Sequence, residues 1–340
     1  MKRMIGPRET IAVLGDGGWG TTLAIHLHRL KHRVRWWGAF PDYVRTLAHR
    51  RENPKYLPGI PIPRGLFVTS DLSQAVTSAH VVILAIPSEH MRPVIRHVVH
   101  ETRPRKGTLF LTAAKGLEQG TLKRMSEVIN EEAGPVPLAV LSGPNIASEI
   151  AKSLPASSVV ASRRAPVALT IQRILGSERL RIYTSSDVTG VELGGALKNP
   201  IAIAAGISDG LGLGTNAKAA LVTRGVVEMA RLGRVMGGRN DTFWGLSGLG
   251  DLITTCLSGR NHWLGEQIGR GRTLREILVS TSMVIEGVKT TQAAVQLARH
   301  HRVELPIMEQ VNAVLFHGRS PRHALNSLMR RTEKTEHYHR

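Results

Sequence analysis

The hydrophobic positions in the first half of the chain fall in short runs that alternate with segments of helical spacing. Most runs are rich in β-branched residues and have the length of strands, and they cover residues 10–14, 33–37, 66–69, 81–86, 108–112, 138–141 and 157–161. Helical spacing occurs between most of them, as at 20–30, 91–100 and 121–132. Strands that alternate with helices predict βαβ units and a parallel, doubly wound sheet.

From about Tyr183 onward, the hydrophobic positions follow a helical period. The segments with this period are separated by glycine-rich loops, and they cover residues 188–208, 215–236, 261–269, 274–280, 290–300, 307–316 and 321–329. We therefore expect an α/β part followed by an all-helical part. A chain of 340 residues is long enough for two domains. The predicted boundary divides residues 8–187 from residues 188–332.

Composition narrows the class of protein. Hydrophobic residues make up 42% of the chain and charged residues 21%, which indicates a globular chain and not a disordered one. The one cysteine, Cys256, excludes a disulfide framework and a zinc site built from several thiolates. No apolar run approaches the roughly 20 residues of a membrane helix, and the N-terminal residues lack the long apolar region of a signal peptide. We expect a cytoplasmic protein without stable membrane insertion.

The net charge of +19 raises the question of nucleic-acid binding. The most basic stretch, residues 319–340, also contains Glu333 and Glu336, and aromatic residues make up only 4% of the chain. Base stacking needs aromatic side chains among the basic ones. We therefore expect no nucleic-acid partner and a basic surface that attracts small anions.

The sequence Gly-Asp-Gly-Gly-Trp-Gly at 15–20 follows the first predicted strand and opens a helix near Trp19. In such a turn the first glycine permits a tight bend, and the second lets a pyrophosphate approach the backbone. The third lets helix and strand pack closely, and the helix N-terminus offers free N–H groups. The motif predicts a dinucleotide site, and the alternative is an ordinary glycine-rich turn.

The residues after the second strand leave the choice between NAD and NADP open. An NAD site usually has an acid there for the ribose 2′-hydroxyl, but residues 36–40 read Trp-Trp-Gly-Ala-Phe and the first acid is Asp42. No basic residue for a 2′-phosphate follows the strand directly either. Arg35 and Arg45 are within reach along the chain, and each is better interpreted as a solvated side chain.

Further motifs follow in order along the chain. They read Lys-Gly-Leu-Glu at 115–118, Ser-Gly-Pro-Asn-Ile-Ala at 142–147, Gly-Val-Glu-Leu-Gly-Gly-Ala-Leu-Lys-Asn at 190–199, Gly-Leu-Gly-Asp-Leu at 248–252, Gly-Arg-Asn at 259–261 and Val-Ile-Glu-Gly-Val at 284–288. Together with the glycine turn, they make the chain resemble NAD(P)-dependent glycerol-3-phosphate dehydrogenases of the bacterial type. The resemblance extends from about residue 10 to residue 330.

The resemblance implies reversible reduction of dihydroxyacetone phosphate to sn-glycerol 3-phosphate, which supplies phospholipid backbones. It also implies a Rossmann-type domain with a doubly wound parallel sheet, a helical domain that carries the catalytic residues, and an active site between them. Members are cytoplasmic and often homodimeric. Two alternatives remain: a related dehydrogenase for another phosphorylated or carboxylated substrate, and a cofactor-binding regulatory protein without turnover.

Lys198 is the predicted catalytic residue. Hydride transfer to a ketone leaves negative charge on the oxygen, so the site needs a proton donor or a cation there. Lys198 lies within a glycine-rich apolar stretch at 193–205, and burial lowers the pKa of a lysine towards neutrality. The resemblance implies that the matching lysine accepts the proton in alcohol oxidation. The alternative is a lysine that reaches solvent from a helix end before Pro200.

A phosphate group is best held by guanidinium and amide donors at a helix N-terminus, which suits Arg260 and Asn261. Asp251 is expected to hold Lys198 charged or to orient a substrate hydroxyl, although a helix N-cap is its simpler interpretation. The resemblance implies a set of substrate-binding residues at the matching positions, namely Lys115, Gly143, Asn145, Lys198, Asp251, Gly259, Arg260 and Asn261.

The resemblance likewise implies cofactor contacts at Gly15, Gly17, Gly18, Trp19, Gly20, Lys115, Ala147, Arg260, Val284 and Glu286. The chain departs from the family pattern where serines are usual, at Gly18, Asn145 and Gly259, and the loop at 256–260 is shortened. It also lacks the basic residue that many members have at Ala39 or Phe40. We expect no metal, because the one pair with ligand-like spacing, His28 and His32, has no acid nearby to complete a site.

Overall fold

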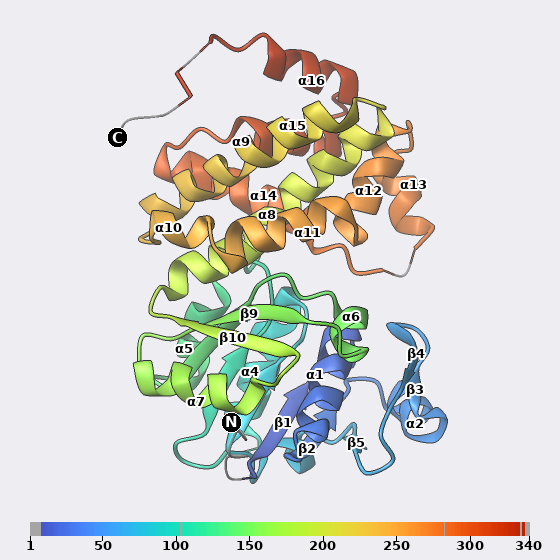
Figure 1. Ribbon diagram of the computed structural model, residues 1–340, viewed down its shortest axis with the longest axis vertical. Helices are drawn as coiled ribbons and strands as arrows, with labels where there is room; N and C mark the ends of the chain where they lie inside the picture. The colour runs from blue at the N-terminus through green and yellow to red at the C-terminus, as the bar shows by residue number, and fades with distance from the viewer. Residues whose placement is uncertain (1–7, 103, 282, 334, 337–340) are drawn as a thin grey trace.

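The structure is a computed structural model that describes residues 8–102, 104–281, 283–333 and 335–336. Within these residues, every strand lies between residues 10 and 185, and the later elements are helices. Figure 1 shows the resulting two parts, a sheet with its helices below and a helical part above. The predicted boundary at 187/188 lies between the last strand and the next helix. That the parts fold as separate domains stays a prediction.

The main sheet has eight strands in the order β10-β9-β8-β7-β6-β1-β2-β5. Their bounds are β1 Thr10–Leu14, β2 Arg33–Trp37, β5 Phe67–Thr69, β6 Val81–Leu84, β7 Leu109–Thr112, β8 Leu138–Ser142, β9 Ala156–Ala161 and β10 Leu180–Ser185. The six strands from β5 to β8 are all parallel, as βαβ connections require. The doubly wound parallel sheet expected from the sequence is therefore present over these strands.

One edge of the sheet differs from the expectation, because β9 pairs with β8 in the antiparallel direction and β10 follows β9 in parallel. The connection from β8 to β9 contains only the five-residue helix α6 (Ala147–Ala151). So short a segment does not cross the sheet, and the chain re-enters the sheet from the end at which β8 leaves it. β10, and the small hairpin of β3 (Glu52–Asn53) with β4 (Leu57–Pro61), were not foreseen.

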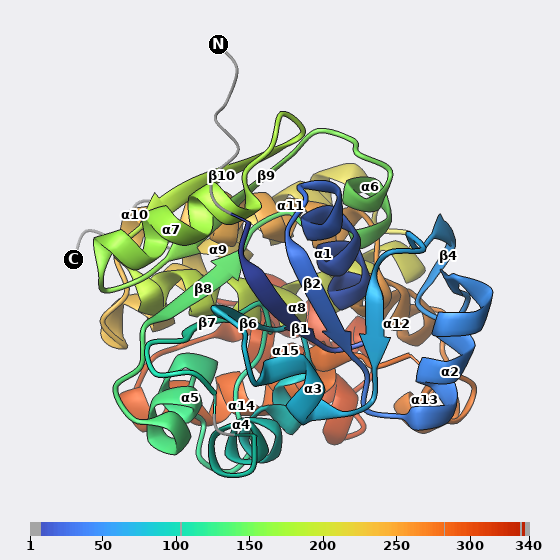
Figure 2. The same ribbon diagram turned by 90° about the horizontal axis from the view of Figure 1, so that it is seen from below.

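Helices cover both faces of the sheet (Figure 2). One layer consists of α1 Gly18–Arg29, α2 Pro41–Arg50, α6 and α7 Ala165–Leu175, and the other of α3 Leu72–Val76, α4 Met91–His100 and α5 Met125–Ala133, with a short 3₁₀ turn, η1 Ser88–His90, before α4. Side chains alternate between the two resulting cores, so that Ile11 and Val13 face α1 while Ala12 and Leu14 face α3 and α4. Burial on both faces explains the continuous apolar strands.

The second part is built around one long helix, α8 (Val188–Gly210), whose residues from Gly190 to Ser208 are all buried. Pro200 lies inside this helix and does not end it. The surrounding elements are α9 Gly214–Val235, α10 Asn240–Phe243, a π-helical turn η2 Leu246–Gly250, α11 Asp251–Leu257, α12 Arg260–Gly269, α13 Leu274–Val279, α14 Glu286–His301, α15 Pro306–Phe316 and α16 Pro321–Met329. These are the helices that the sequence pattern predicts, with shorter ones added.

Helices α8 and α12 pack backbone against backbone. A Cβ placed at Gly206 of α8, or at Gly265 of α12, would come within 2.0 Å of a carbonyl oxygen of the other helix. Gly210 and Gly269 make the same kind of contact one turn further on, with distances of 2.4 and 2.6 Å. Side chains of any size at these four positions would separate the two helices.

A buried ion pair joins the two parts. Glu192 of α8 accepts hydrogen bonds from Arg124 at 2.7 Å and from the backbone N–H of Ser126 at 2.7 Å, just where α5 begins. The hydroxyl of Ser126 also donates to Glu192, at 2.5 Å. Arg124 and Glu192 are both buried, so water does not screen this pair. It holds α8 against the sheet part.

Candidate active site

The glycine turn connects β1 to α1 at the carboxyl edge of the sheet. A Cβ at Gly15 would come within 2.3 Å of the carbonyl oxygen of Ala85, and one at Gly20 within 2.1 Å of the carbonyl oxygen of Gly15. These glycines are required by close packing. A Cβ at Gly17, in contrast, would meet nothing within 4 Å. The open space lies where the motif predicts that a pyrophosphate approaches the backbone.

Helix α1 begins at Gly18, and its N-terminus has no side-chain cap and no acid in its first turn. Its first N–H groups therefore keep their partial positive charge, which favours an anion at this end. A Cβ at Gly18 would come within 2.6 Å of the carbonyl oxygen of Tyr56, which explains why serine is absent here. Ala147 lies next to this helix, and its carbonyl oxygen accepts a hydrogen bond from Thr22 at 3.0 Å. The cradle fits a dinucleotide.

Lys198 projects from the middle of α8, and its exposed fraction is only 7%. Its Nζ donates to Oδ1 of Asp251 and to the hydroxyl of Thr255, at 2.6 Å each. Because α8 continues through Pro200, the interpretation of Lys198 as a solvated lysine at a helix end does not describe its position. Glycine at position 195 lets α8 lie close to the end of β8, because a Cβ there would come within 2.7 Å of the hydroxyl of Ser142.

Lys115 reaches the same carboxylate from the sheet side. Its Nζ donates to Oδ2 of Asp251 at 2.6 Å and to the carbonyl oxygen of Gly143 at 2.9 Å. Gly143 has a φ of 135°, a conformation that favours glycine. Lys115 follows β7 and Gly143 follows β8, so the carboxyl ends of two neighbouring strands meet the helical part here. Asp251 is the first residue of α11, but its side chain binds two lysines and does not cap the helix.

The surroundings shift the pKa values of Lys198 and Glu286. Burial lowers the pKa of Lys198 to about 8, although the charge of Asp251 raises it and the charge of Lys115 lowers it further. Burial raises the pKa of Glu286, at the start of α14, and the charges of Arg260, Lys198 and Lys115 act against this rise. A lysine with a pKa near neutrality is able to give or take a proton at physiological pH.

Three asparagines of the sequence motifs take part in side-chain hydrogen bonds. Asn261 donates to Oδ1 of Asn199 at 2.9 Å and accepts from the backbone N–H of Gly287 at 3.0 Å. Oδ1 of Asn145 accepts from Ser158 at 2.5 Å. The Nδ2 atoms of Asn145 and Asn199 are buried without a hydrogen-bond partner among the described residues. Unpaired buried donors are costly, and they fit a polar ligand that accepts hydrogen bonds.

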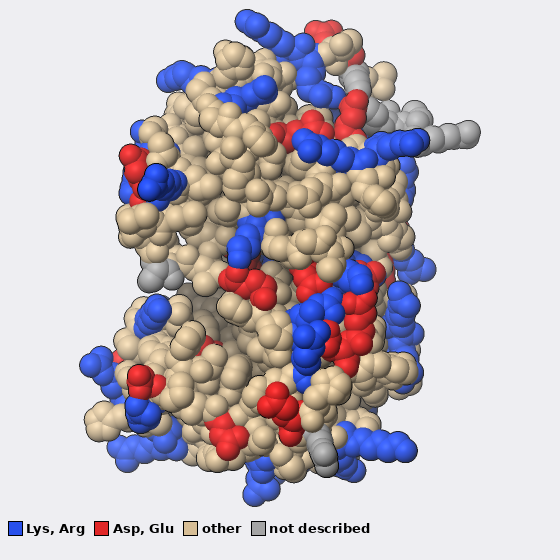
Figure 3. Space-filling view, turned by 180° about the vertical axis from the view of Figure 1, so that it is seen from behind, with Lys and Arg blue, Asp and Glu red and all other residues tan. Residues whose placement is uncertain are grey.

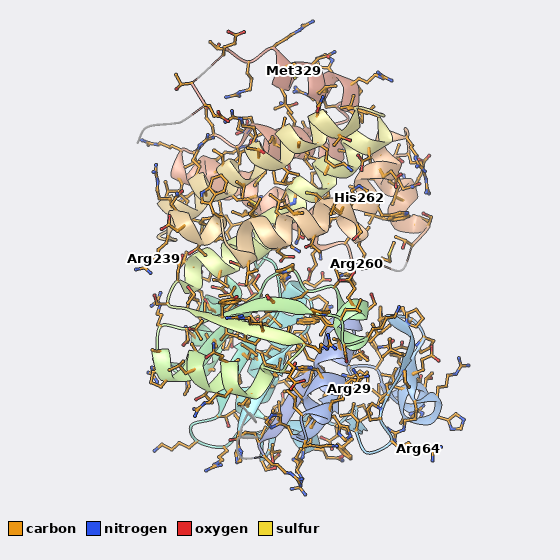
Figure 4. The ribbon with its side chains drawn as sticks, in the orientation of Figure 1. Arg29, Arg64, Arg239, Arg260, His262 and Met329 are labelled. Atoms are coloured by element: carbon orange, nitrogen blue, oxygen red, sulfur yellow. The ribbon has the colours of Figure 1, made fainter. Side chains whose placement is uncertain are left out.

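The remaining predicted residues lie at the edge of the site. Arg260 begins α12 and is exposed, and Figure 4 shows it at the junction of the two parts. Gly259 precedes it with a φ of 106°. Val284 has an exposed fraction of 37%, and Glu286 is half-buried. Figure 3 shows a hollow between the sheet part and the helical part on the side seen there.

Sequence reasoning missed some of the residues that complete this arrangement. Thr255 was not foreseen, although it lies four residues after Asp251 and so on the same face of α11. Asn199 follows Lys198 in a recognised motif, but its hydrogen bond to Asn261 joins residues 62 positions apart. Asn53, which is fully buried and donates to the carbonyl oxygen of Asp16 at 2.8 Å, carries no local signal.

The described residues contain no group of three or more His, Cys, Asp or Glu side chains arranged to hold a metal ion. His32 instead accepts a hydrogen bond from the backbone N–H of Glu9, at 3.3 Å. Within these residues, no helix has both the length and the apolar character needed to cross a membrane.

Family models cover most of the chain. One described as the N-terminus of NAD-dependent glycerol-3-phosphate dehydrogenase matches residues 10–168, and one described as the C-terminus matches residues 187–326. The chain belongs to the NAD-dependent glycerol-3-phosphate dehydrogenase family. The family predicted from the motifs is thereby confirmed.

Glycerol-3-phosphate dehydrogenases of several bacteria align with nearly the whole chain. The protein named glycerol-3-phosphate dehydrogenase (NAD(P)+) 2 of Salinibacter ruber is 46% identical over 334 residues, which are 97% of this chain and 96% of the relative. The enzyme of Syntrophotalea carbinolica is 46% identical over 331 residues, which are 96% of this chain and 99% of the relative. Such coverage leaves little of the chain outside the family's architecture.

The crystal structure of glycerol-3-phosphate dehydrogenase from Coxiella burnetii has the same fold. It aligns with a TM-score of 0.91 at 38% identity, covering 95% of this chain and 99% of the other. The predicted fold class, a Rossmann-type sheet followed by a helical part, is confirmed. The antiparallel β9 is a detail within that class.

Proposed function

We propose that the protein is an NAD(P)-dependent sn-glycerol-3-phosphate dehydrogenase that reversibly reduces dihydroxyacetone phosphate to sn-glycerol 3-phosphate. The observation that supports it best is the buried group of Lys198, Asp251 and Lys115, which stands at the same sheet edge as the open glycine turn. The names of the full-length relatives agree with this activity. It would supply glycerol 3-phosphate for glycerophospholipid synthesis.

Lys198 is the proposed catalytic residue. Bound NAD(P)H supplies the hydride for the ketone carbon of the substrate. As the carbon–hydrogen bond forms, the carbonyl electron pair moves onto the oxygen, and the Lys198 ammonium donates the proton that makes it a hydroxyl. In the oxidation direction, the neutral amine takes this proton back. With a pKa of about 8, Lys198 is suited to both directions.

Asp251 and Lys115 prepare Lys198 for this task. The carboxylate of Asp251 fixes the direction of the Lys198 amine through a 2.6 Å hydrogen bond. Lys115 adds a second positive charge beside the developing oxyanion, and it lies at the strand edge where the cofactor and the substrate meet. The excess of positive over negative charge in this trio favours an anionic substrate.

The substrate phosphate is assigned to the start of α12. Arg260 offers a guanidinium, Asn261 an amide, and Gly259 an open backbone before a helix N-terminus. The unpaired Nδ2 of Asn145 is then assigned as a donor to the carbonyl and hydroxyl end. The altered residues of this loop are expected to tune affinity for the phosphate.

The cofactor is assigned to the glycine turn and to the residues that border it. The pyrophosphate would lie over Gly15, Gly17, Gly18, Trp19 and Gly20, at the uncapped N-terminus of α1. Further contacts are assigned to residues from both sides of the junction, namely Lys115, Ala147, Arg260, Val284 and Glu286.

We also assign the protein to the cytoplasm. A homodimeric state is proposed as well, because closed symmetric dimers are the commonest oligomers. Light scattering on the purified protein would test the dimer.

The decisive experiment follows the oxidation of NADH and of NADPH with dihydroxyacetone phosphate. Wild-type protein should turn over, and Lys198→Met should lose about 10²–10⁴ of the rate, which is the range for general acid–base catalysis. Lys106→Met serves as the control, because Lys106 is exposed and lies before β7, at the opposite end of that strand from Lys115. Cofactor binding without turnover in the wild-type protein would instead favour the regulatory alternative. Turnover of a different phosphorylated or carboxylated ketone would favour the related dehydrogenase.

A further inference from the structure

The side chain of Asp16 occupies the end of β2. Dinucleotide sites that bind NAD usually have an acid at the end of the second strand, where it accepts a hydrogen bond from the ribose 2′-hydroxyl. This chain has Gly38 there. A Cβ placed at Gly38 would come within 2.7 Å of Oδ2 of Asp16 and within 3.1 Å of its Cβ. The carboxylate expected from β2 is thus delivered to the same place from the glycine turn.

The backbone around Asp16 is held on both sides. Trp36 of β2 donates to the carbonyl oxygen of Gly15 at 2.8 Å, and Asn53 donates to the carbonyl oxygen of Asp16 at 2.8 Å. Asn53 also donates to the hydroxyl of Thr21 at 2.7 Å. These hydrogen bonds fix the backbone from which the Asp16 side chain projects towards Gly38.

The carboxylate of Asp16 has an oxygen that accepts no hydrogen bond from the described residues. This oxygen, Oδ2, is buried, and burial raises the pKa of Asp16. The arginines near this end are engaged elsewhere: Arg35 donates to the carbonyl oxygen of Gln74 at 2.9 Å, and Arg45 pairs with Asp42. An unpaired acceptor at this place fits a hydroxyl donor.

Lys55 is the cation whose charge acts on Asp16. It is exposed, and its Nζ lies 4.9 Å from the centre of the Tyr56 ring. A solvated lysine held over a ring offers only a screened charge to a ligand. The residues that directly follow Gly38, Ala39 and Phe40, are exposed and uncharged, so they provide nothing for a 2′-phosphate.

We propose that Asp16 makes the protein select NAD(H) over NADP(H), by accepting a hydrogen bond from the 2′-hydroxyl of the adenosine ribose. The inference rests on the proposed function only in that the glycine turn binds a dinucleotide. NADP(H) has a phosphate in place of that hydroxyl, so it has no donor for the carboxylate and brings like charge against it. Asp16 is then a specificity-determining residue.

The test measures equilibrium binding of NADH and of NADPH to the full chain by fluorescence titration, without substrate. Salt is kept at about 0.15 M, where exposed charges interact over about 8 Å, so that the net charge of the protein does not favour the more anionic cofactor. Wild-type protein should bind NADH more tightly than NADPH by about tenfold or more. Asp16→Asn should tighten NADPH binding with little change for NADH, and Asp16→Ala should also weaken NADH binding. The ratio of the two dissociation constants should fall in both variants.

Glu178→Gln is the matched control, because it removes an equal charge from an exposed side chain just before β10, on the far side of the sheet from β2. It should leave the ratio unchanged. A wild-type protein that binds NADPH as tightly as NADH would overturn the proposal, and so would a ratio that shifts in Glu178→Gln but not in the Asp16 variants. Damage to the turn alone would weaken both cofactors equally and leave the ratio as it was, which also contradicts the proposal. These outcomes do not depend on turnover, so they are distinct from a failure of the proposed reaction.

Discussion

The Nζ atom of Lys198 lies 2.6 Å from Oδ1 of Asp251, and both side chains are almost fully withdrawn from water. The second oxygen of the same carboxylate accepts a hydrogen bond from Lys115. Lys198 thus has one neighbour that favours its charged form and one that disfavours it. Removing either neighbour should therefore shift the pKa of Lys198, in opposite directions.

The pH profile of the reaction should follow Lys198. Oxidation of glycerol 3-phosphate needs the neutral amine, so its rate should rise with pH through about 8 and level off above, while reduction should be full below about 8 and fall above. Asp251→Asn removes a charge that raises the pKa of Lys198, and should move the oxidation midpoint to lower pH. Lys115→Met removes a charge that lowers the pKa, and should move it to higher pH.

Steady-state rates over a pH series would check this, with the midpoint in Lys106→Met expected at the wild-type value. If Asp251→Asn and Lys115→Met shift the midpoint in the same direction, Lys198 is not the group that titrates.

Alanine substitutions at two glycines of the turn should affect different properties of the protein. Gly17→Ala places its Cβ in open space, so the melting temperature should stay near the wild-type value while cofactor binding weakens by tenfold or more. Gly20→Ala places its Cβ 2.1 Å from the carbonyl oxygen of Gly15, so the melting temperature itself should fall. Thermal unfolding and NADH titration of both variants would separate the effects. Tight cofactor binding by Gly17→Ala would show that the pyrophosphate lies elsewhere.

The buried pair of Glu192 and Arg124 should matter for stability in a non-additive way. Removing one partner, by Glu192→Gln or Arg124→Met, leaves an uncompensated buried group and should lower the free energy of unfolding by about 3–5 kcal/mol. Replacing both should cost less than the sum of the two. Urea unfolding is the measurement. The exposed pair of Arg45 and Asp42 is the control, for which Arg45→Met should change the free energy by less than about 1 kcal/mol. Additive losses would mean that the two side chains act independently.

Glu228 of α9 should make stability depend on pH. Its carboxylate accepts from the backbone N–H groups of Ile307 and Met308 at the start of α15, but burial raises its pKa from 4.5 to about 8. The folded protein then holds this proton more tightly than the unfolded chain does. Its contribution to stability is full below about 4.5 and is lost as pH rises towards 8.

Glu228→Gln cannot ionise, so its free energy of unfolding should fall less between pH 5 and pH 8 than that of the wild-type protein, since each pKa unit is worth about 1.4 kcal/mol. Urea titrations of both proteins at the two pH values would measure the difference. Equal falls in both proteins would mean that Glu228 titrates in the fold as it does in the unfolded chain.

Local patterns were enough to predict much of the fold. The alternation of short apolar runs with helical spacing gave the parallel strands, and the glycine turn at 15–20 was placed correctly between β1 and α1. The direction of β9 was not predictable, because an apolar run reads the same whether its strand is parallel or antiparallel to its neighbour. β10 was missed since its solvent-facing positions, such as Tyr183, weaken the apolar signal.

The sequence indicated which residues form the candidate site better than it indicated which of them contact one another. The sequence left three interpretations of Asp251 open: it keeps Lys198 charged, orients a substrate hydroxyl or caps a helix. The structure brings it against Lys198 across 53 positions of sequence. That Lys115 shares the same carboxylate followed from no spacing, because it depends on how the helical part docks on the sheet. Asp16 shows the limit most clearly, because the usual pattern has an acid directly after the second strand, whereas the carboxylate at that place comes here from the turn before α1.

The backbone contact between α8 and α12 has a consequence for the dimensions of the proposed site. Lys198 lies on α8 and Arg260 starts α12, so the span between the proposed proton donor and the proposed phosphate site is set by two helices that touch without side chains between them. Since no side chains lie between the helices at Gly206 and Gly265, the backbone contact fixes the distance between the two ends of the proposed site. A side chain introduced at either glycine would push the helices apart and should lengthen that distance.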